Sequence, residues 1–378
     1  MKFIAIPFYD FTKPIITPKY DKNVAIQLPD GDFLINSEPY GLPGRVDKLD
    51  RFTGEVTTIY THSTVLRLTP MEVLHDGNVI LLAFDYPYNN HRLYRSTDPT
   101  LTNFEEVLYM GHTKPYSKHG ISQGEDGTIL CGEYIGSYAW NKPDANTECK
   151  VWKSDDNGSN WDVLYAFRRN NHADQFGDEL MGNGIQHIHV IEYDKYTKSF
   201  WIGTGDSDRE SSLWRWNESE GFNLIGRGYA DGYEIDEGQY YRAISLEFYP
   251  DSVMWGMDGF LAGTWIVRYD RESGELTRTT EKQTDGYMFY SDTLRLKGGN
   301  DVSFFSSTSG TIYGSYDRHN SHVVQEFEGT HRTRYVHNKF DNEMLFTGQG
   351  DLKLDGEPIY TDSINFKPRI IPLKFLSS

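Results

Sequence analysis

The chain has few cysteines, few cations and no long apolar or helical segment. Among its 378 residues there are only two cysteines, Cys131 and Cys149, which is too few for a disulfide framework or a cysteine-rich zinc site. They could form one bond across a loop, but two reduced thiols are the simpler interpretation. No stretch is apolar for long enough to span a membrane, and none keeps the spacing of three and four that is typical of a long amphipathic helix. The sequence therefore predicts no membrane insertion and few helices.

Positive charge is also scarce. The sequence has 37 Lys and Arg against 55 Asp and Glu, and its formal net charge is −18. This balance argues against nucleic acid or an anionic membrane as a general partner. Residues 1–13 contain a short apolar run interrupted by Pro7 and lack the long core and the cleavage site of a signal peptide. We therefore expect a soluble protein that is cytoplasmic by default, or one that is associated with a virion and released by lysis.

Aromatic residues and glycine are abundant instead. Aromatic residues make up 15% of the chain, with 26 Tyr and 21 Phe, and there are 35 Gly. Strand formers together with turn formers indicate β-structure. Because all-β folds of this length often form one unit, we expect a single domain over residues 1–378.

The segment Ser154–Trp161 (SDDNGSNW) fits the pattern S-x-D-x-G-x-x-W. In this spacing the Asp156 carboxylate can accept hydrogen bonds from its own turn, and Gly158 can take the positive φ of a tight reversal. Trp161 then opens the next strand with a large ring to bury. The segment resembles the Asp-box, or BNR repeat, of sialidase-like β-propellers. The resemblance implies a hairpin turn on the face opposite to the catalytic face of such a propeller.

Related turns recur along the chain between apolar runs. Leu49–Thr57 (LDRFTGEVT) is repeated as Tyr269–Thr277 (YDRESGELT), and Asp-Gly turns recur at residues 30–31, 76–77 and 126–127. The repeating units begin near Val24, Leu66, His119, His187, Arg242, Tyr290 and Tyr335. Each has room for four short strands, which predicts an all-β fold, a β-propeller of seven blades, with six blades or a β-sandwich as alternatives. We expect a strand at Lys2–Phe8 to complete the short last blade and close the ring.

Carboxylates recur where the second strands of these units would end. The five positions are Glu38, Asp85, Glu133, Asp206 and Asp258. In a four-stranded blade these ends lie on the face opposite to the Asp-box turn. Capping of a turn would explain any one of them, whereas five together predict an acidic rim.

The first strands, which line the channel of a propeller, begin with histidine, tyrosine and arginine. Alternate side chains of His187-Ile188-His189 should point to the same side of their strand, and His119 and His337 also lie at strand starts. A lone histidine is usually structural, but several in one channel indicate a site. The longest predicted loops, residues 111–120, 168–184 and 229–241, fall on the same face, and loops on a rigid scaffold often carry function.

Aromatic rings beside carboxylates, arginine and histidine are typical of a carbohydrate site. The residues that we expect to bind a glycan are Asp85, Tyr86, Tyr88, His91, Tyr116, Tyr134, Trp140 and Arg209. The resemblance implies the same ligand class, because Asp-box propellers often act on glycans. A standard sialidase is not expected, since the early Arg-Ile-Pro motif of that family is missing and Gly44-Arg45-Val46 does not match it.

Two cleavage reactions remain open. Hydrolysis needs two carboxyl groups. For these we predict Asp206, Asp208 and Glu210, with Glu133 or Asp85 opposite. Elimination from a uronic acid needs a cation for the sugar carboxylate, a base and an acid. For elimination we predict Arg242, Tyr241, His119, His187 and His189.

Neither reaction requires a cofactor, although a divalent metal is an alternative. Asp231, Glu234, Asp236 and Glu237 offer oxygen ligands for Ca²⁺ without the spacing of an EF-hand. The histidines at positions 119, 187 and 189 could bind Zn²⁺ or Mn²⁺, but a hydrogen-bonded histidine cluster is the simpler interpretation.

The sequence therefore predicts a carbohydrate-active enzyme, either a glycoside hydrolase or a polysaccharide lyase, with its site in the funnel of a propeller. The first alternative is a non-catalytic glycan-binding or receptor-binding propeller, such as a phage tail protein that binds cell-surface polysaccharide. A scaffold that binds proteins is the second alternative.

Overall fold

The computed structural model describes residues 25–359 with several gaps. The gaps are residues 31, 37–43, 51–54, 63–66, 86–89, 117, 136–147, 169–184, 206–209, 228–238, 260–263, 285, 296–300, 309–310, 316, 327–330, 340–342, 351 and 355–356. Outside these gaps the regular structure is β-strands and short 3-10 turns, among them η1 (Lys118–Gly120). No helix in this part of the chain is long and apolar enough to cross a membrane. The strand predicted at Lys2–Phe8 lies outside the described residues.

Six antiparallel sheets of four strands follow one another along the chain. The first is β1 (Ala25–Gln27), β2 (Phe33–Asn36), β3 (Gly44–Leu49) and β4 (Val56–His62), and the second is β5 (Arg67–Val73), β6 (Val79–Asp85), β7 (Asn90–Ser96) and β8 (Phe104–Gly111). The third is β10 (Ile121–Gln123), β11 (Ile129–Gly132), β13 (Glu148–Ser154) and β14 (Asp162–Arg168), and β9 (Thr113–Lys114) pairs with β12 (Tyr134–Ile135) beside it. The fourth is β15 (His187–Asp194), β16 (Ser199–Gly205), β17 (Ser212–Asn217) and β18 (Gly221–Arg227).

The remaining strands complete the circle. The fifth sheet is β19 (Glu247–Phe248), β20 (Ser252–Gly256), β21 (Ile266–Asp270) and β22 (Leu276–Arg278), and the sixth is β23 (Met288–Arg295), β24 (Asp301–Ser307), β25 (Thr311–Ser315) and β26 (His322–Glu326). Two hairpins follow, formed by β27 (His331–Lys339) with β28 (Glu343–Gly350) and by β29 (Leu352–Leu354) with β30 (Glu357–Ile359).

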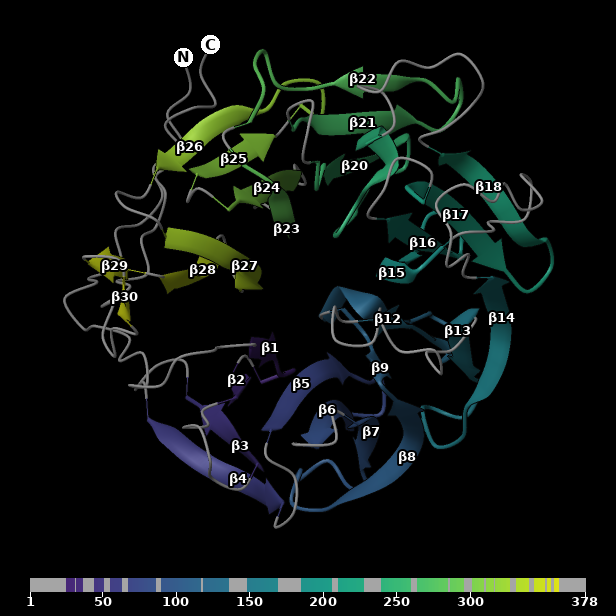
Figure 1. The fold of residues 1–378 in the computed structure, drawn as a ribbon, viewed down its shortest axis with the longest axis vertical. Coiled ribbons are helices and arrows are strands. Elements are labelled where there is room, and N and C mark those ends of the chain that lie inside the picture. Colours follow the sequence, from purple (N-terminus) through teal and green to yellow (C-terminus); the bar gives the residue numbers. More distant parts are fainter. Residues whose placement is uncertain are drawn as a thin grey trace.

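The sheets stand around one axis as the blades of a propeller (Figure 1). The first strand of each blade lies nearest the axis, and the hairpin β27–β28 fills the seventh position, between the sixth blade and the first. The prediction of an all-β propeller is therefore confirmed: the described residues form six four-stranded blades, and the two-stranded hairpin β27–β28 holds a seventh position. The predicted starts of the repeating units fall within a few residues of β1, β5, β10, β15, β19, β23 and β27.

Apolar side chains fill the space between neighbouring blades. Trp201 of the fourth blade and Trp255 of the fifth are almost completely buried in one cluster with Val190. Neighbouring blades also approach closely at a glycine. A Cβ on Gly256 would lie only 2.2 Å from Cβ of Met288 in the next blade. The two cysteines are buried free thiols, as predicted. Burial of large apolar rings between sheets supplies the main stabilisation of such a ring.

The turn Ser154–Trp161 joins β13 to β14 and has the hydrogen bonds expected from its sequence. Oδ1 of Asp156 accepts a bond from the Asn160 N–H at 2.8 Å and one from the Ser154 hydroxyl at 2.9 Å, and Gly158 has a φ of 82°. The turn also contacts the second blade, because Arg95 Nε donates to the Asn157 carbonyl oxygen at 2.7 Å. The hydrogen bonds of this turn thus stabilise the β13–β14 hairpin and connect the third blade to the second.

Replacing Asp156 with alanine should lower the free energy of unfolding by about 1–3 kcal/mol, because the carboxylate accepts several hydrogen bonds within the turn. Urea unfolding measures the loss. Asp155→Ala is the matched control, since that side chain is 65% exposed and pairs with Lys153 at the surface. Equal losses in the two variants would contradict the structural role of Asp156.

Candidate active site on the propeller axis

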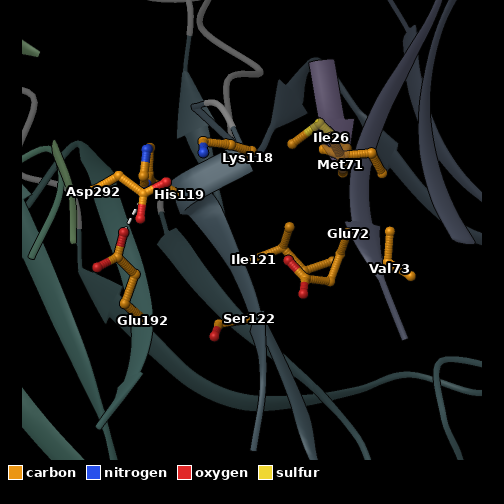
Figure 2. Close-up of a pocket in the computed structure, with 10 residues that line it drawn as sticks. All are labelled: Ile26, Met71, Glu72, Val73, Lys118, His119, Ile121, Ser122, Glu192 and Asp292. Atoms are coloured by element: carbon orange, nitrogen blue, oxygen red, sulfur yellow. Dashed lines mark hydrogen bonds and ion pairs between the residues drawn. The ribbon is translucent and has the colours of Figure 1, made fainter. Parts of the chain in front are cut away.

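The first strands of the blades enclose a pocket of about 390 Å³. Figure 2 shows the lining residues, which come from six different elements around the axis. They are Ile26 of β1, Met71, Glu72 and Val73 of β5, Lys118 and His119 of η1, Ile121 and Ser122 of β10, Glu192 of β15 and Asp292 of β23. The pocket is therefore formed jointly by the first, second, third, fourth and sixth blades rather than by one blade.

Three glutamates, Glu72, Glu192 and Glu247, occupy the same position in the second, fourth and fifth blades. Two residues after each glutamate, the chain bonds or pairs across the turn that leads to the second strand: Leu74 with Asn78, Asp194 with Ser199 and Tyr249 with Ser252. None of the three was among the site residues predicted from the sequence. The sequence signal for this set was a glutamate between an apolar residue and an apolar or aromatic one near the end of each first strand, in the runs MEVL, IEYD and LEFY.

Burial favours the protonated form of these carboxyl groups. It raises the pKa of Glu72 and that of Glu192 to about 8. Burial, followed by the charge of Asp292, also raises the pKa of Glu247 well above its usual range. The side chain of Glu192 is 17% exposed, so it remains within reach of a ligand. The pocket is therefore much less negative than its count of acids suggests.

His119 and Glu192 are in direct contact. His119 Nδ1 and Glu192 Oε1 form a short hydrogen bond, drawn as the dashed line in Figure 2, and Glu192 Oε2 accepts the Leu246 N–H at 2.9 Å. Burial, followed by the positive charge of Lys118, lowers the pKa of His119 well below its usual range. A neutral imidazole thus faces a neutral carboxylic acid, which is a combination found at acid–base sites.

Four of the predicted site residues form a ring cluster at the start of β15. The rings of His187 and His189 are 5.1 Å apart and nearly parallel, at 16°. The Tyr134 ring lies 4.4 Å from that of His187, and the Tyr116 ring lies 5.5 Å from that of His189. Both histidines are almost fully buried, whereas both tyrosines are partly exposed. The tyrosines are therefore the members of the cluster that a ligand would contact.

A β-bulge at His189 shapes this cluster. Ile188 pairs with Thr204 and Val190 with Gly203, so His189 is the additional residue between them. Bulges are frequent beside active sites because they re-aim a side chain. Tyr116 contacts His189, and η1 packs against β15, where His119 contacts Glu192. The ring cluster and the axial pocket thus adjoin each other.

Arg242, which we predicted to neutralise a sugar carboxylate, already has an internal partner. Its Nη2 lies 3.0 Å from Asp258 Oδ2, and both side chains are less than a tenth exposed. A Cβ on Gly205 would lie 3.1 Å from Arg242 Cγ and 3.1 Å from His189 Cε1, so the arginine stands beside the ring cluster. Tyr241 packs against Trp255, with ring centroids 6.4 Å apart. A role for Arg242 as the cation of elimination stays a prediction that this ion pair does not favour.

Glu133 also has internal partners. It is 1% exposed and accepts bonds from the Lys150 N–H and the Trp152 Nε1–H, each at 3.1 Å. Asp85 ends β6 and His91 lies on β7, away from the axial strands. A hydrolytic role for Glu133 stays a prediction that its burial does not favour.

Several predicted residues lie outside the described part of the chain: Tyr86, Tyr88, Trp140, Asp206, Asp208, Arg209, Asp231, Glu234, Asp236 and Glu237. Within the described part, no group of three or more His, Cys, Asp or Glu side chains is arranged to hold a metal ion.

Comparisons with known proteins bear on the fold. No protein-family model matches the sequence, and no curated protein matches it. Among solved structures, a catalytically inactive variant of virginiamycin B lyase from Staphylococcus aureus is similar at 12% identity and a TM-score of 0.56, covering 89% of this chain and 94% of that chain. The WD40 β-propeller domain of Doa1 is similar at 11% identity and a TM-score of 0.54, covering 90% and 93%. A prolyl endopeptidase structure matches 89% of this chain but 47% of its own, at 10% identity and a TM-score of 0.55.

These structures share the propeller fold with this chain. Their sequence identities are so low that they show the fold and nothing about function. The chain is thus a β-propeller protein, and the sialidase relationship implied by the Asp-box pattern gains no support from the comparisons.

Proposed function

We propose that the protein is a carbohydrate-active enzyme that cleaves a glycan containing uronic acid by elimination, in the pocket on the propeller axis. The observation that carries the proposal is the contact between His119 and Glu192. It places a neutral base and a protonated acid together in a pocket that Lys118 also lines. A base, an acid and a cation are the three groups that elimination needs.

The proposed reaction breaks two bonds without consuming water. The imidazole of His119 takes the proton from C5 of the uronic acid, and the C5–H electron pair becomes the C4–C5 double bond. The C4–O bond breaks, and Glu192 gives its proton to the departing oxygen. Lys118 stabilises the negative charge that develops on the sugar carboxylate. The C5 proton is on Nε2 of His119, so the hydrogen bond then carries the Nδ1 proton of the imidazolium to the Glu192 carboxylate, and proton exchange with solvent returns His119 to its starting tautomer.

The protonated state of Glu72 and Glu192 also favours an anionic sugar. If both were ionised, a pocket that also contains Asp292 would repel a uronate. Because burial holds their pKa values at about 8, the repulsion is small at neutral pH. The partly exposed rings of Tyr116 and Tyr134 offer a stacking surface for a neighbouring sugar.

Incubation with a panel of neutral and uronic-acid polysaccharides tests the reaction. We expect new reducing ends together with the ultraviolet absorbance of unsaturated uronate, and we expect both only with uronic-acid polymers. Reducing ends without absorbance would show hydrolysis and overturn the proposal. Retention on an immobilised glycan without any cleavage would show a binding protein instead.

A further inference from the structure

A second group of polar side chains lies on the second blade, away from the axial pocket. Arg67 of β5 pairs with Phe84 of β6, which in turn pairs with His91 of β7. Residues directly opposite in an antiparallel sheet share a face, so these three form one row. The rings of Phe84 and His91 are 5.0 Å apart. The row therefore combines a flat aromatic surface with a guanidinium and an imidazole.

Lys114 lies beside this row, on strand β9, which contacts β7. It pairs with Tyr134 of β12, and Tyr134 belongs to the ring cluster. Lys114 is partly buried and interacts electrostatically with Arg67 and with His91. His112, two residues earlier, is exposed and also interacts with His91. Four basic side chains from three strands and a turn thus converge between the second and third blades.

Like charges weaken one another in this group. Burial, followed by the charge of Arg67, lowers the pKa of Lys114. Burial, followed by the charges of Lys114 and His112, lowers the pKa of His91 to about 4, although a bond to the Gly111 backbone opposes this. Repulsion among these positive charges therefore destabilises the folded protein when no anion is bound.

His91 gives a second, independent indication. Its residue exposure is 8%, and its Nδ1 atom is buried without a hydrogen-bond partner among the residues that the structure describes. Buried polar atoms are normally satisfied, and an unsatisfied one often marks the place of a water or an ion. A proton on this nitrogen would let it donate to an anion.

We propose that Arg67, His91, His112 and Lys114 form a binding site for an oxyanion, such as a sulfate or a carboxylate group. An oxyanion would neutralise Arg67 and Lys114 and accept a bond from protonated His91. Since Lys114 pairs with Tyr134, the anion is best supplied by a charged group on the glycan that occupies the ring cluster. This last assignment, unlike the site itself, rests on the proposed function.

Calorimetric titration with sodium sulfate at constant ionic strength tests the site. We expect the native protein to bind sulfate with uptake of protons, because anion binding raises the pKa of His91. Lys114→Gln should weaken the affinity at least tenfold, while its thermal midpoint without sulfate stays equal or rises because repulsion is relieved. Lys195→Gln is the matched control, since Lys195 is exposed in the turn between β15 and β16. Absence of sulfate binding by the native protein, or equal affinity in the Lys114 and Lys195 variants, would overturn the site.

The source of the anion is resolved by comparing a sulfated oligosaccharide with its desulfated counterpart and with inorganic sulfate. Tighter binding of the sulfated sugar than of the other two, lost in Lys114→Gln, is the expected result. Binding of inorganic sulfate alone would refute the assignment to a glycan. Failure of the elimination reaction would appear only in the absorbance assay, so the two proposals are separable.

Discussion

Glutamine in place of Glu192 should lower glycan cleavage by at least about 100-fold at pH 7 and leave the propeller folded. Glutamine has the shape and the neutrality of the protonated carboxyl group that burial favours here. It cannot give a proton to the leaving oxygen, and it cannot take the proton back from His119. We therefore expect the loss in kcat with little change in KM, measured by the absorbance of the unsaturated product.

Glu105→Gln provides the matched control, because Glu105 is exposed on β8 and lies outside the pocket. His119→Gln should reduce kcat to a similar extent, and the double variant should lose little more, since the two residues act as one unit. Unchanged kcat in Glu192→Gln with an unchanged thermal midpoint would refute its role as the acid. A parallel loss of activity and folding would instead assign Glu192 a structural role, which is why both are measured.

Stability should fall as pH rises from about 6.5 to 8. The pKa of Glu72 and that of Glu192 are raised from 4.5 to about 8 in the folded protein. Between these values the folded state holds protons that the unfolded state has lost, so each rise in pH favours unfolding. Each fully shifted group lowers the free energy of unfolding by up to about 1.4 kcal/mol per pH unit. Glu247 acts in the same direction.

The histidines with lowered pKa values act in the opposite direction, but only at lower pH. His91 and His119 contribute stability that increases up to about pH 6.5, their unfolded value. Above this pH the glutamates should dominate, with Lys118 and Asp292 as the charged groups beside them.

Urea unfolding at several pH values measures the slope. Glu72→Gln and Glu192→Gln should each flatten it, the double variant should flatten it further, and each should be more stable than the native protein at pH 8. A slope that is unchanged in the double variant would contradict the protonated state of both carboxyl groups.

The fold was predictable because its signals are local. Asp-Gly turns and the Ser154–Trp161 hairpin depend on a few neighbouring residues, and their recurrence located the start of each blade to within a few residues. The ring cluster was partly predictable for the same reason, since strand alternation already brings His187 and His189 together.

The roles of single polar residues were less predictable. Arg242 and Glu133 were assigned to chemistry from residue type, but Asp258 and Trp152 engage them inside the protein. Conversely, Glu72 and Glu192 are isolated acids in the sequence and become neighbours only when the ring closes. Burial and partners that lie far away along the chain decide such roles, and neither is expressed in a local pattern.

Because His189 is a bulge residue, the pairing of β15 with β16 does not depend on it. Because β15 and β16 pair on both sides of that residue, deleting it would leave a regular hairpin and remove one ring from the cluster. Strand register elsewhere in the blade, including the position of Glu192, would be retained. Insertion or deletion of one codon can therefore add or remove this histidine of the ring cluster. The fold of the blade and the axial pocket stay unchanged.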